Sequence, residues 1–185
     1  MKSILILLSL TTISFITSGC QPVSPDQLAR ERGKIANASQ IPVTNLSISG
    51  TWNAACVKDA GVMYRQDSLV INGNYATTIS NYFSDSNCTS PLYTETLNGL
   101  YQLNTDVYGV TNLAVTWSKV LIVPDTTEIV KTFNQQNFCQ ISSWAVYQTH
   151  QTSTVACGLS NTSNNAIKLN DANTLTMAAE TYLKK

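Results

Sequence analysis

The sequence has little charge, and this excludes one class of partner. Only 12% of its 185 residues are charged, 11 basic and 11 acidic, about half of the roughly 25% usual for a soluble domain. The basic residues form no stripe that could attract a phosphate backbone, so we expect no nucleic-acid partner. Serine, threonine, asparagine and glutamine supply the polarity instead, which favours β-structure outside the cytoplasm.

Residues for catalysis or metal binding are also scarce. His150 is the only histidine and has no carboxylate near it in sequence, whereas a catalytic triad or a histidine metal site needs such partners. We therefore expect an exposed strand histidine, no cofactor, no metal and no enzyme. The cysteines are too far apart for a Cys-x-x-Cys motif, and we expect Asp85 to cap a loop rather than bind calcium.

The first twenty residues indicate export. Lys2 precedes an apolar run over residues 4–16, which is too short for a permanent membrane span. The ending Thr17-Ser18-Gly19-Cys20 resembles the lipobox of bacterial lipoproteins, in which a peptidase cuts before a cysteine that carries diacylglycerol. Cys20 is then the lipidation site, and the alternative is a plain signal peptide. Because Gln21 is not the aspartate that retains lipoproteins at the inner membrane, this resemblance implies anchoring in the outer membrane.

The composition predicts three segments: a signal peptide over residues 1–19, a lipidated tether over residues 20–46 and a β-domain over residues 47–185. Prolines and a large share of all the charge fall in the tether, where a short helix after Ser24 would be marginal by itself. We interpret this segment as a spacer. The alternative is that its basic residues rest on anionic head groups.

From residue 47 onward the pattern alternates with period two, which is typical of β-strands. One expected strand has an apolar face formed by Tyr93, Leu97, Tyr101 and Leu103, and a hairpin turn is expected at residues 72–74. Further strands are expected at residues 113–123, around Ile129, Val130 and Phe133, over residues 144–155, and near residues 169 and 175–177. The total of about eight strands predicts an all-β antiparallel barrel or sandwich.

Four cysteines remain once Cys20 is set aside, and they allow three disulfide connectivities. In a meander, Cys56 and Cys88 fall at the same end, so they form a plausible pair. A simple hairpin would separate Cys139 from Cys157 by more than the roughly 7 Å that a disulfide permits between Cα atoms. We favour Cys56–Cys88 and Cys139–Cys157, with the segment between the latter two as a looped excursion.

Two resemblances suggest the architecture. Gly50-Thr51-Trp52 is similar to the Gly-x-Trp start of lipocalins, in which the tryptophan closes the bottom of the barrel. Over residues 49–103 the pattern Ser-Gly-Thr-Trp, Cys56, Tyr82-Phe83 and Cys88-Thr89 resembles the lipid-binding ectodomain repeat of the adenomatosis polyposis coli down-regulated family of Wnt inhibitors. In that family the repeat is a lipocalin-like open barrel whose apolar interior holds an acyl chain, so the resemblance implies a β-barrel and permits a hydrophobic ligand.

We therefore expect a membrane-anchored lipoprotein of the cell envelope whose barrel binds a small hydrophobic molecule or lipid. The alternative is a structural or protein-interaction lipoprotein with a filled core. Eight strands leave an interior that side chains can fill, so the same aromatic residues suit either hypothesis. The candidate ligand-binding residues are Trp52, Tyr75, Phe83, Tyr93, Tyr101 and Trp117.

Overall fold

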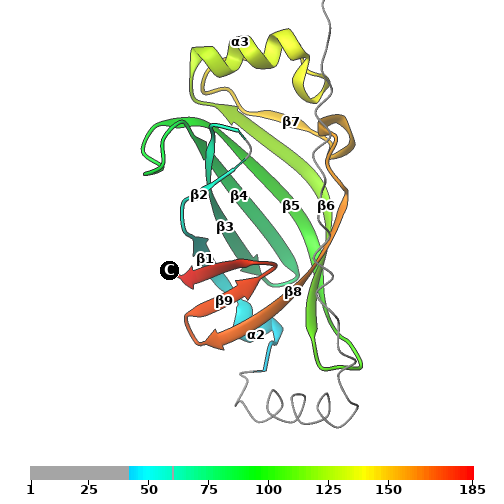
Figure 1. Cartoon of the computed structure of the whole chain (residues 1–185). Helices are drawn as coiled ribbons and strands as arrows, with labels where there is room; N and C mark the ends of the chain where they lie inside the picture. Colours follow the sequence, from blue (N-terminus) through cyan, green and yellow to red (C-terminus); the bar gives the residue numbers. More distant parts are fainter. Residues whose placement is uncertain (1–41, 60) are drawn as a thin grey trace, which may run out of the picture. The chain divides into compact units, whose positions relative to one another are not determined.

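The computed structural model describes residues 42–59 and 61–185, and its strands form one ten-stranded antiparallel sheet (Figure 1). The predicted signal peptide and lipidation site, Cys20, lie outside the described residues, as does most of the predicted tether. The elements are α2 (Asn45–Ile48), β1 (Gly50–Ala54), β2 (Val57–Lys58), β3 (Tyr64–Asn72), β4 (Tyr75–Phe83), β5 (Pro91–Thr105), β6 (Thr111–Pro124), α3 (Thr127–Gln136), η1 (Phe138–Gln140), β7 (His150–Thr152), η2 (Val155–Cys157), β8 (Thr162–Asp171), β9 (Thr174–Met177) and β10 (Glu180–Lys184).

Eight of these strands close into a barrel. Their order around the ring is β1, β3, β4, β5, β6, β8, β9 and β10, and β10 pairs again with β1. Each ring strand pairs with its neighbours in sequence, which makes an up-and-down meander, while β2 and β7 pair outside the ring. The prediction of an all-β antiparallel barrel of about eight strands is confirmed, and the topology fits a lipocalin-like barrel. Within the described ranges, no helix is long and apolar enough to cross a membrane.

The hairpin expected at residues 72–74 is confirmed. Asn72 pairs with Tyr75, and the two residues between them make the turn, with Gly73 at φ 59°, a conformation that glycine adopts without strain. Gly99 has a different role, because a Cβ there would collide with the backbone oxygen of Thr116 on β6. The bulge between Asn98 and Gly99 occurs at this close approach.

The strand expected around Ile129, Val130 and Phe133 is instead helix α3. The Thr126 side chain accepts a hydrogen bond from the Ile129 backbone N–H at 3.3 Å, which caps the first turn. Asn137 ends the helix in the left-handed conformation. Ile129 and Val130 lie four and three residues before Phe133, so both share a helical face with it. All three pack in the same hydrophobic cluster.

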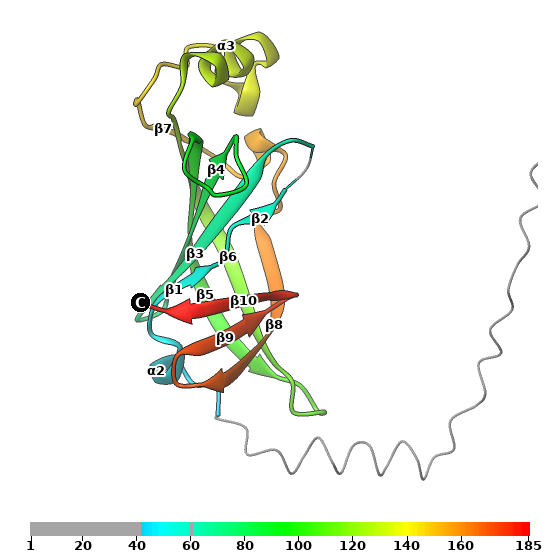
Figure 2. The ribbon, with the colours of Figure 1, turned by 60° about the vertical axis from the view of Figure 1, so that its left-hand side comes forward.

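The strand expected over residues 144–155 is also wrong, because only β7 is extended there. The rest is loop and the short helix η2, and this excursion joins α3 and η1 to β8. Both favoured disulfides are present: Cys139–Cys157 joins η1 to η2, and Cys56–Cys88 joins the end of β1 to the β4–β5 loop. We call α3, η1, β7, η2 and their connections the cap; it lies at the end of the barrel opposite α2 (Figures 1 and 2).

Two hydrophobic clusters fill different parts of the molecule. The lower core, at the α2 end, is built around Trp52, which is fully buried and donates its indole N–H to the Ile48 carbonyl at 2.7 Å. Its other buried members are Ile48, Ala54, Leu69, Ile71, Ala76, Tyr101, Leu113, Val115, Trp117, Ile167, Leu169, Leu175, Met177 and Tyr182. The upper cluster joins β5 and β6 to the cap, and its buried members are Tyr93, Val120, Ile122, Phe133, Cys139 and Trp144.

Candidate functional site

The six predicted ligand-binding residues do not line one site. Trp52, Tyr101 and Trp117 pack together in the lower core, and Tyr93 belongs to the upper cluster. Tyr75 is 64% exposed on the outer face of β4. The expectation that Tyr75 faces the interior is wrong, because β4 turns its neighbour Ala76 inward instead. Phe83 is half-buried and follows an irregularity in the strand register after Tyr82, so alternation does not assign its face.

The barrel interior changes from apolar to polar along the strands. In the lower half, Leu69 and Ile71 of β3 are buried, and alternation turns Asp67 and Arg65 to the same inner face. The strand registers align Asp67 with Ser80, Ser80 with Glu95 and Glu95 with Ile122 across β3, β4, β5 and β6. Polar side chains therefore form a row inside the barrel, immediately above the lower core.

Arg65 is the centre of this polar region. Its Nη2 donates to Glu180 Oε1 at 3.0 Å, and its Nη1 donates to Asp59 Oδ1 at 3.4 Å. Its Nε lies 3.0 Å from Asp67 Oδ2. Asp59, Arg65, Asp67, Glu95 and Glu180 are defined here as the interior charge cluster; Glu95 joins them through its place in the row. The Arg65–Glu180 pair links β3 to β10 at a level beyond the end of β1.

An aromatic wall lies beside the charges. The next row up begins with Arg65, which pairs with Tyr82 of β4, and Tyr82 pairs with Tyr93 of β5. The two tyrosine rings stack with their centroids 4.2 Å apart. Tyr93 meets Phe133 of α3 edge to face, and Phe133 contacts Trp144. The upper interior is therefore amphipathic: Arg65, Asp67 and Glu180 of β3 and β10 and Glu95 of β5 supply charge, and Tyr82, Tyr93 and the cap supply aromatic rings.

Burial controls the protonation of these groups. It raises the pKa of the Asp67 carboxyl, more than the Ser80 hydroxyl and Arg65 lower it. Burial, with the nearby Asp67 charge, also raises the pKa of Glu95. Burial raises the pKa of Tyr82 to about 12, so its phenol is neutral at physiological pH. Although burial lowers the pKa of the Arg65 guanidinium, the charges of Asp67 and Glu180 outweigh it, and Arg65 remains a cation.

Two buried polar atoms of the cluster have hydrogen-bonding capacity to spare. The Arg65 Nε–H does not point at Asp67 Oδ2 as a hydrogen bond requires, and Asp67 Oδ1 has no hydrogen-bond partner within the described residues. Such atoms are almost always satisfied in folded proteins, by protein, water or ligand. The Arg65 and Asp67 side chains keep 28% and 15% of their surface exposed, although these two atoms are themselves buried.

The remaining candidates have structural roles. His150 is only partly exposed, and its ring lies 4.5 Å from that of Trp144, so the expectation of an exposed histidine is wrong. Asp85 accepts the backbone N–H groups of Asn87, Thr89 and Ser90, which confirms its role as a loop cap. In residues 42–59 and 61–185, no three His, Cys, Asp or Glu side chains gather as they would around a metal ion.

The sequence matches no protein-family model and no curated protein.

The sequence contains signals for the charge cluster. Leu69 and Ile71 face inward, and side chains alternate along a strand. Asp67 and Arg65, two and four residues before Leu69, therefore also face inward. Glu95 lies between Tyr93 and Leu97 on the face already identified as apolar. A charged residue at a core position of a strand was the missed indication.

Proposed function

We propose that this chain is a membrane-anchored lipoprotein of the cell envelope whose barrel binds a small hydrophobic or amphipathic molecule in its upper half. One observation carries the proposal: a half-buried charge cluster faces an aromatic wall inside a closed barrel. Small-molecule sites commonly combine an apolar lining with a few convergent polar groups. The stacked Tyr82 and Tyr93 rings suit the apolar part of a ligand, while Arg65 and Asp67 suit its polar group.

The lower half is not part of the proposed site. Trp52 is fully buried there and Trp117 nearly so, and the cluster around them is continuous. An acyl chain held deep in the barrel would have to displace these side chains. The ligand we propose is therefore small and bound near the cap, not a long chain threaded along the barrel axis.

Anchoring through Cys20 is the second part of the proposal, and it depends on the lipobox-like sequence that ends at this cysteine. Intact mass spectrometry of the chain extracted from membranes tests it. The expected mass lacks residues 1–19 and carries diacylglycerol, and Cys20→Ser abolishes both changes. A mature chain that begins elsewhere, without added lipid, would contradict anchoring but would leave ligand binding open.

Native mass spectrometry with solvent extraction tests the binding site. The full chain, purified gently from membranes, is expected to carry a bound mass that organic solvent removes. Arg65→Met keeps most of the apolar length but removes the charge, and it is expected to lose that mass. Lys58→Met removes an exposed charge from the neighbouring strand β2 and is expected to retain it.

An empty wild-type barrel that takes up no fatty acid, isoprenoid or amphipathic amine would contradict ligand binding. The result would favour the alternative, a protein-interaction lipoprotein with a filled core. The continuous packing of the lower core is the observation that supports this second candidate.

A further inference from the structure

The tip of the β5–β6 hairpin carries an unusual group of exposed apolar side chains. Val107 is 93% exposed, Tyr108 79% and Val110 43%. Nine large hydrophobic side chains are exposed in the described part of the chain. Five of them lie on β4 and this hairpin: these three, and Tyr75 and Leu100 on the outer face. Such a concentration of exposed apolar surface indicates an interaction site.

The polar groups of the tip form hydrogen bonds within the turn, although Asp106 itself is exposed. The Asp106 N–H donates to the Val110 carbonyl, and the Gly109 N–H donates to the Asp106 carbonyl. Asp106 Oδ1 accepts the N–H groups of Tyr108 and Val110 at 2.8 and 2.9 Å. The turn therefore satisfies much of its own backbone and its one carboxylate, and presents mainly side chains of valine and tyrosine to the outside.

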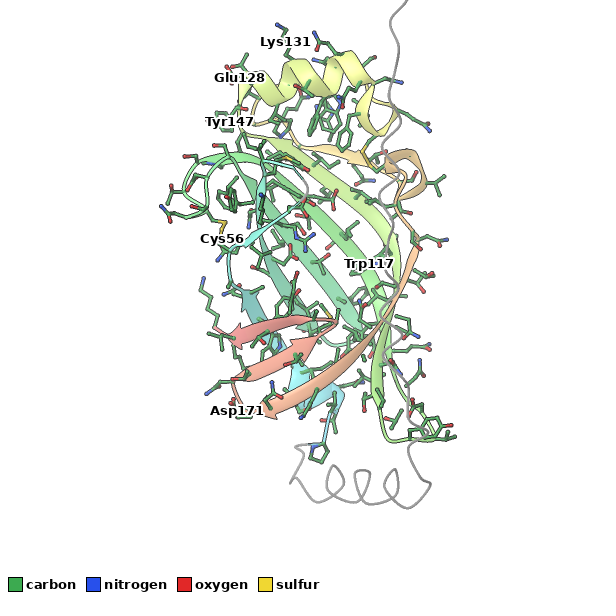
Figure 3. The ribbon with its side chains drawn as sticks, viewed as in Figure 1. Cys56, Trp117, Glu128, Lys131, Tyr147 and Asp171 are labelled. Atoms are coloured by element: carbon green, nitrogen blue, oxygen red, sulfur yellow. A yellow bond between two sulfur atoms is a disulfide. The ribbon has the colours of Figure 1, made fainter. Side chains whose placement is uncertain are left out.

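The whole hairpin is nearly free of charge. Between Glu95 and Lys119, Asp106 is the only charged residue. A surface that recognised a charged protein partner would need charges of its own, whereas lipid favours neutral loops with aliphatic side chains and tyrosine at the head-group level. The nearest charged turn at this end, β8–β9 with Asp171, is separate from the tip (Figure 3).

The position of the tip also agrees with a membrane. Figures 1 and 2 both show the tip at the α2 end of the barrel, opposite the cap. Asn45 of α2 and Asn104 of β5 line one outer hollow of about 710 Å³, so the described chain begins close to the base of the hairpin. From Cys20 to Pro42 the chain advances 42 − 20 = 22 residues, enough to reach about 70 Å when extended.

We infer that the β5–β6 tip, residues 106–110, inserts into the lipid head-group region and holds the barrel with its cap directed away from the membrane. This inference rests on the membrane anchoring proposed above, but not on the ligand. It makes the tip a second, weak membrane contact that sets orientation while Cys20 sets attachment.

Depth-dependent fluorescence quenching tests the inference. The full Tyr108→Trp chain is reconstituted into vesicles of phosphatidylethanolamine and phosphatidylglycerol that contain brominated phosphatidylcholine. Its added emission is expected to shift to the blue and to be quenched most by lipids brominated near the head group. Tyr147→Trp is the matched control, because Tyr147 is 75% exposed in the cap (Figure 3) and is expected to be unquenched.

A version of each chain that begins at residue 20 and carries Cys20→Ser separates the tip from the anchor, because it has neither the lipid nor the apolar residues 4–16. Quenching of position 108 in either version, without quenching at 147, supports the inference even if Cys20 carries no lipid. Absence of quenching at 108 in both versions overturns it, as does equal quenching at both positions. Tip burial through self-association, seen as concentration-dependent sedimentation without quenching, also overturns it.

Replacing Val107 and Tyr108 with aspartate gives an independent measurement. In the Cys20→Ser chain, this double variant is expected to lower vesicle partitioning by about tenfold or more, because it removes most of the apolar surface that would enter the interface. Tyr147→Asp is expected to leave partitioning unchanged. Both sites are strongly exposed, so an unchanged thermal midpoint would verify that the fold is intact. Equal partitioning of the tip variant and its parent would contradict the inference.

Discussion

The two halves of the barrel interior differ in what fills them. The lower core is apolar and continuous around Trp52, whereas the upper half opposes a charge cluster on β3 and β10 to an aromatic wall under the cap. The same strands run through both halves, so the difference lies in the side chains at successive inner positions. On β3 these positions change from Ile71 and Leu69 to Asp67 and Arg65.

The two halves of the interior therefore contribute differently to stability and to function. Burial of apolar surface stabilises the lower half, while burial of charge in the upper half costs free energy unless each charge is paired. A fold selected for stability alone would extend the apolar rows to the cap. The polar rows are therefore the part of the interior that needs a functional explanation.

The largest expected effect comes from Trp52→Ala in the lower half. Removing a fully buried tryptophan leaves a cavity and ends the indole hydrogen bond to Ile48, so unfolding free energy should fall by about 3–5 kcal/mol. Tyr75→Ala is the control, because Tyr75 lies on the outer face, and it should change stability by about 0.5 kcal/mol or less. Equal losses of unfolding free energy for the two variants in chemical denaturation would contradict the placement of Trp52 inside the barrel and of Tyr75 on its outer face.

The second effect concerns the cap. Replacing Cys139 and Cys157 together with serine opens a loop of 18 residues, and a disulfide across a loop of that size stabilises a protein by about 3 kcal/mol. We expect hydrogen exchange to rise in α3 and β7 while β1 and β10 remain protected. A uniform rise over the whole barrel would show that the cap is not a separate region.

The smallest effect is a pH dependence from Glu95. Burial raises its pKa in the folded state, so folding binds a proton that the unfolded chain releases. Stability from this group is thus present at acid pH and is lost as pH rises from the ordinary carboxyl pKa through the raised value. Glu95→Gln removes this loss and should raise the thermal midpoint at neutral pH more than at acid pH.

Glu128→Gln supplies the comparison, because Glu128 lies exposed on the outer face of α3 (Figure 3). It should not change the pH profile in this way. A Glu95→Gln midpoint that falls further below wild type at neutral pH than at acid pH would mean that the charged Glu95 carboxylate is favourably paired, contrary to its raised pKa.

Much of the lower half could be predicted from sequence because its strands alternate clearly. The inner positions of Tyr101 and Leu103 and the turn at Gly73 follow from periodicity and turn chemistry. β10 was missed, since residues 180–184 contain only two large apolar side chains.

The upper half could be predicted less well, for reasons that particular residues show. Residues 64–68 of β3 are nearly all polar, so alternation among them does not show which side chains face inward. Only the position of Leu69 shows it. On β4 the large apolar residues Tyr75 and Ile79 face outward, while small residues face inward beside the lower core. α3 was mistaken for a strand because its apolar residues were counted without the capping threonine before them.

A high-resolution crystal structure of the chain purified from membranes without delipidation would test the central claim most directly. We expect non-protein density in the upper half, in contact with Arg65 or Asp67 and with the Tyr82–Tyr93 stack, above a lower core filled by Trp52 and its neighbours. Ordered water alone around the charge cluster, or a ligand seated between Trp52 and Trp117, would contradict it.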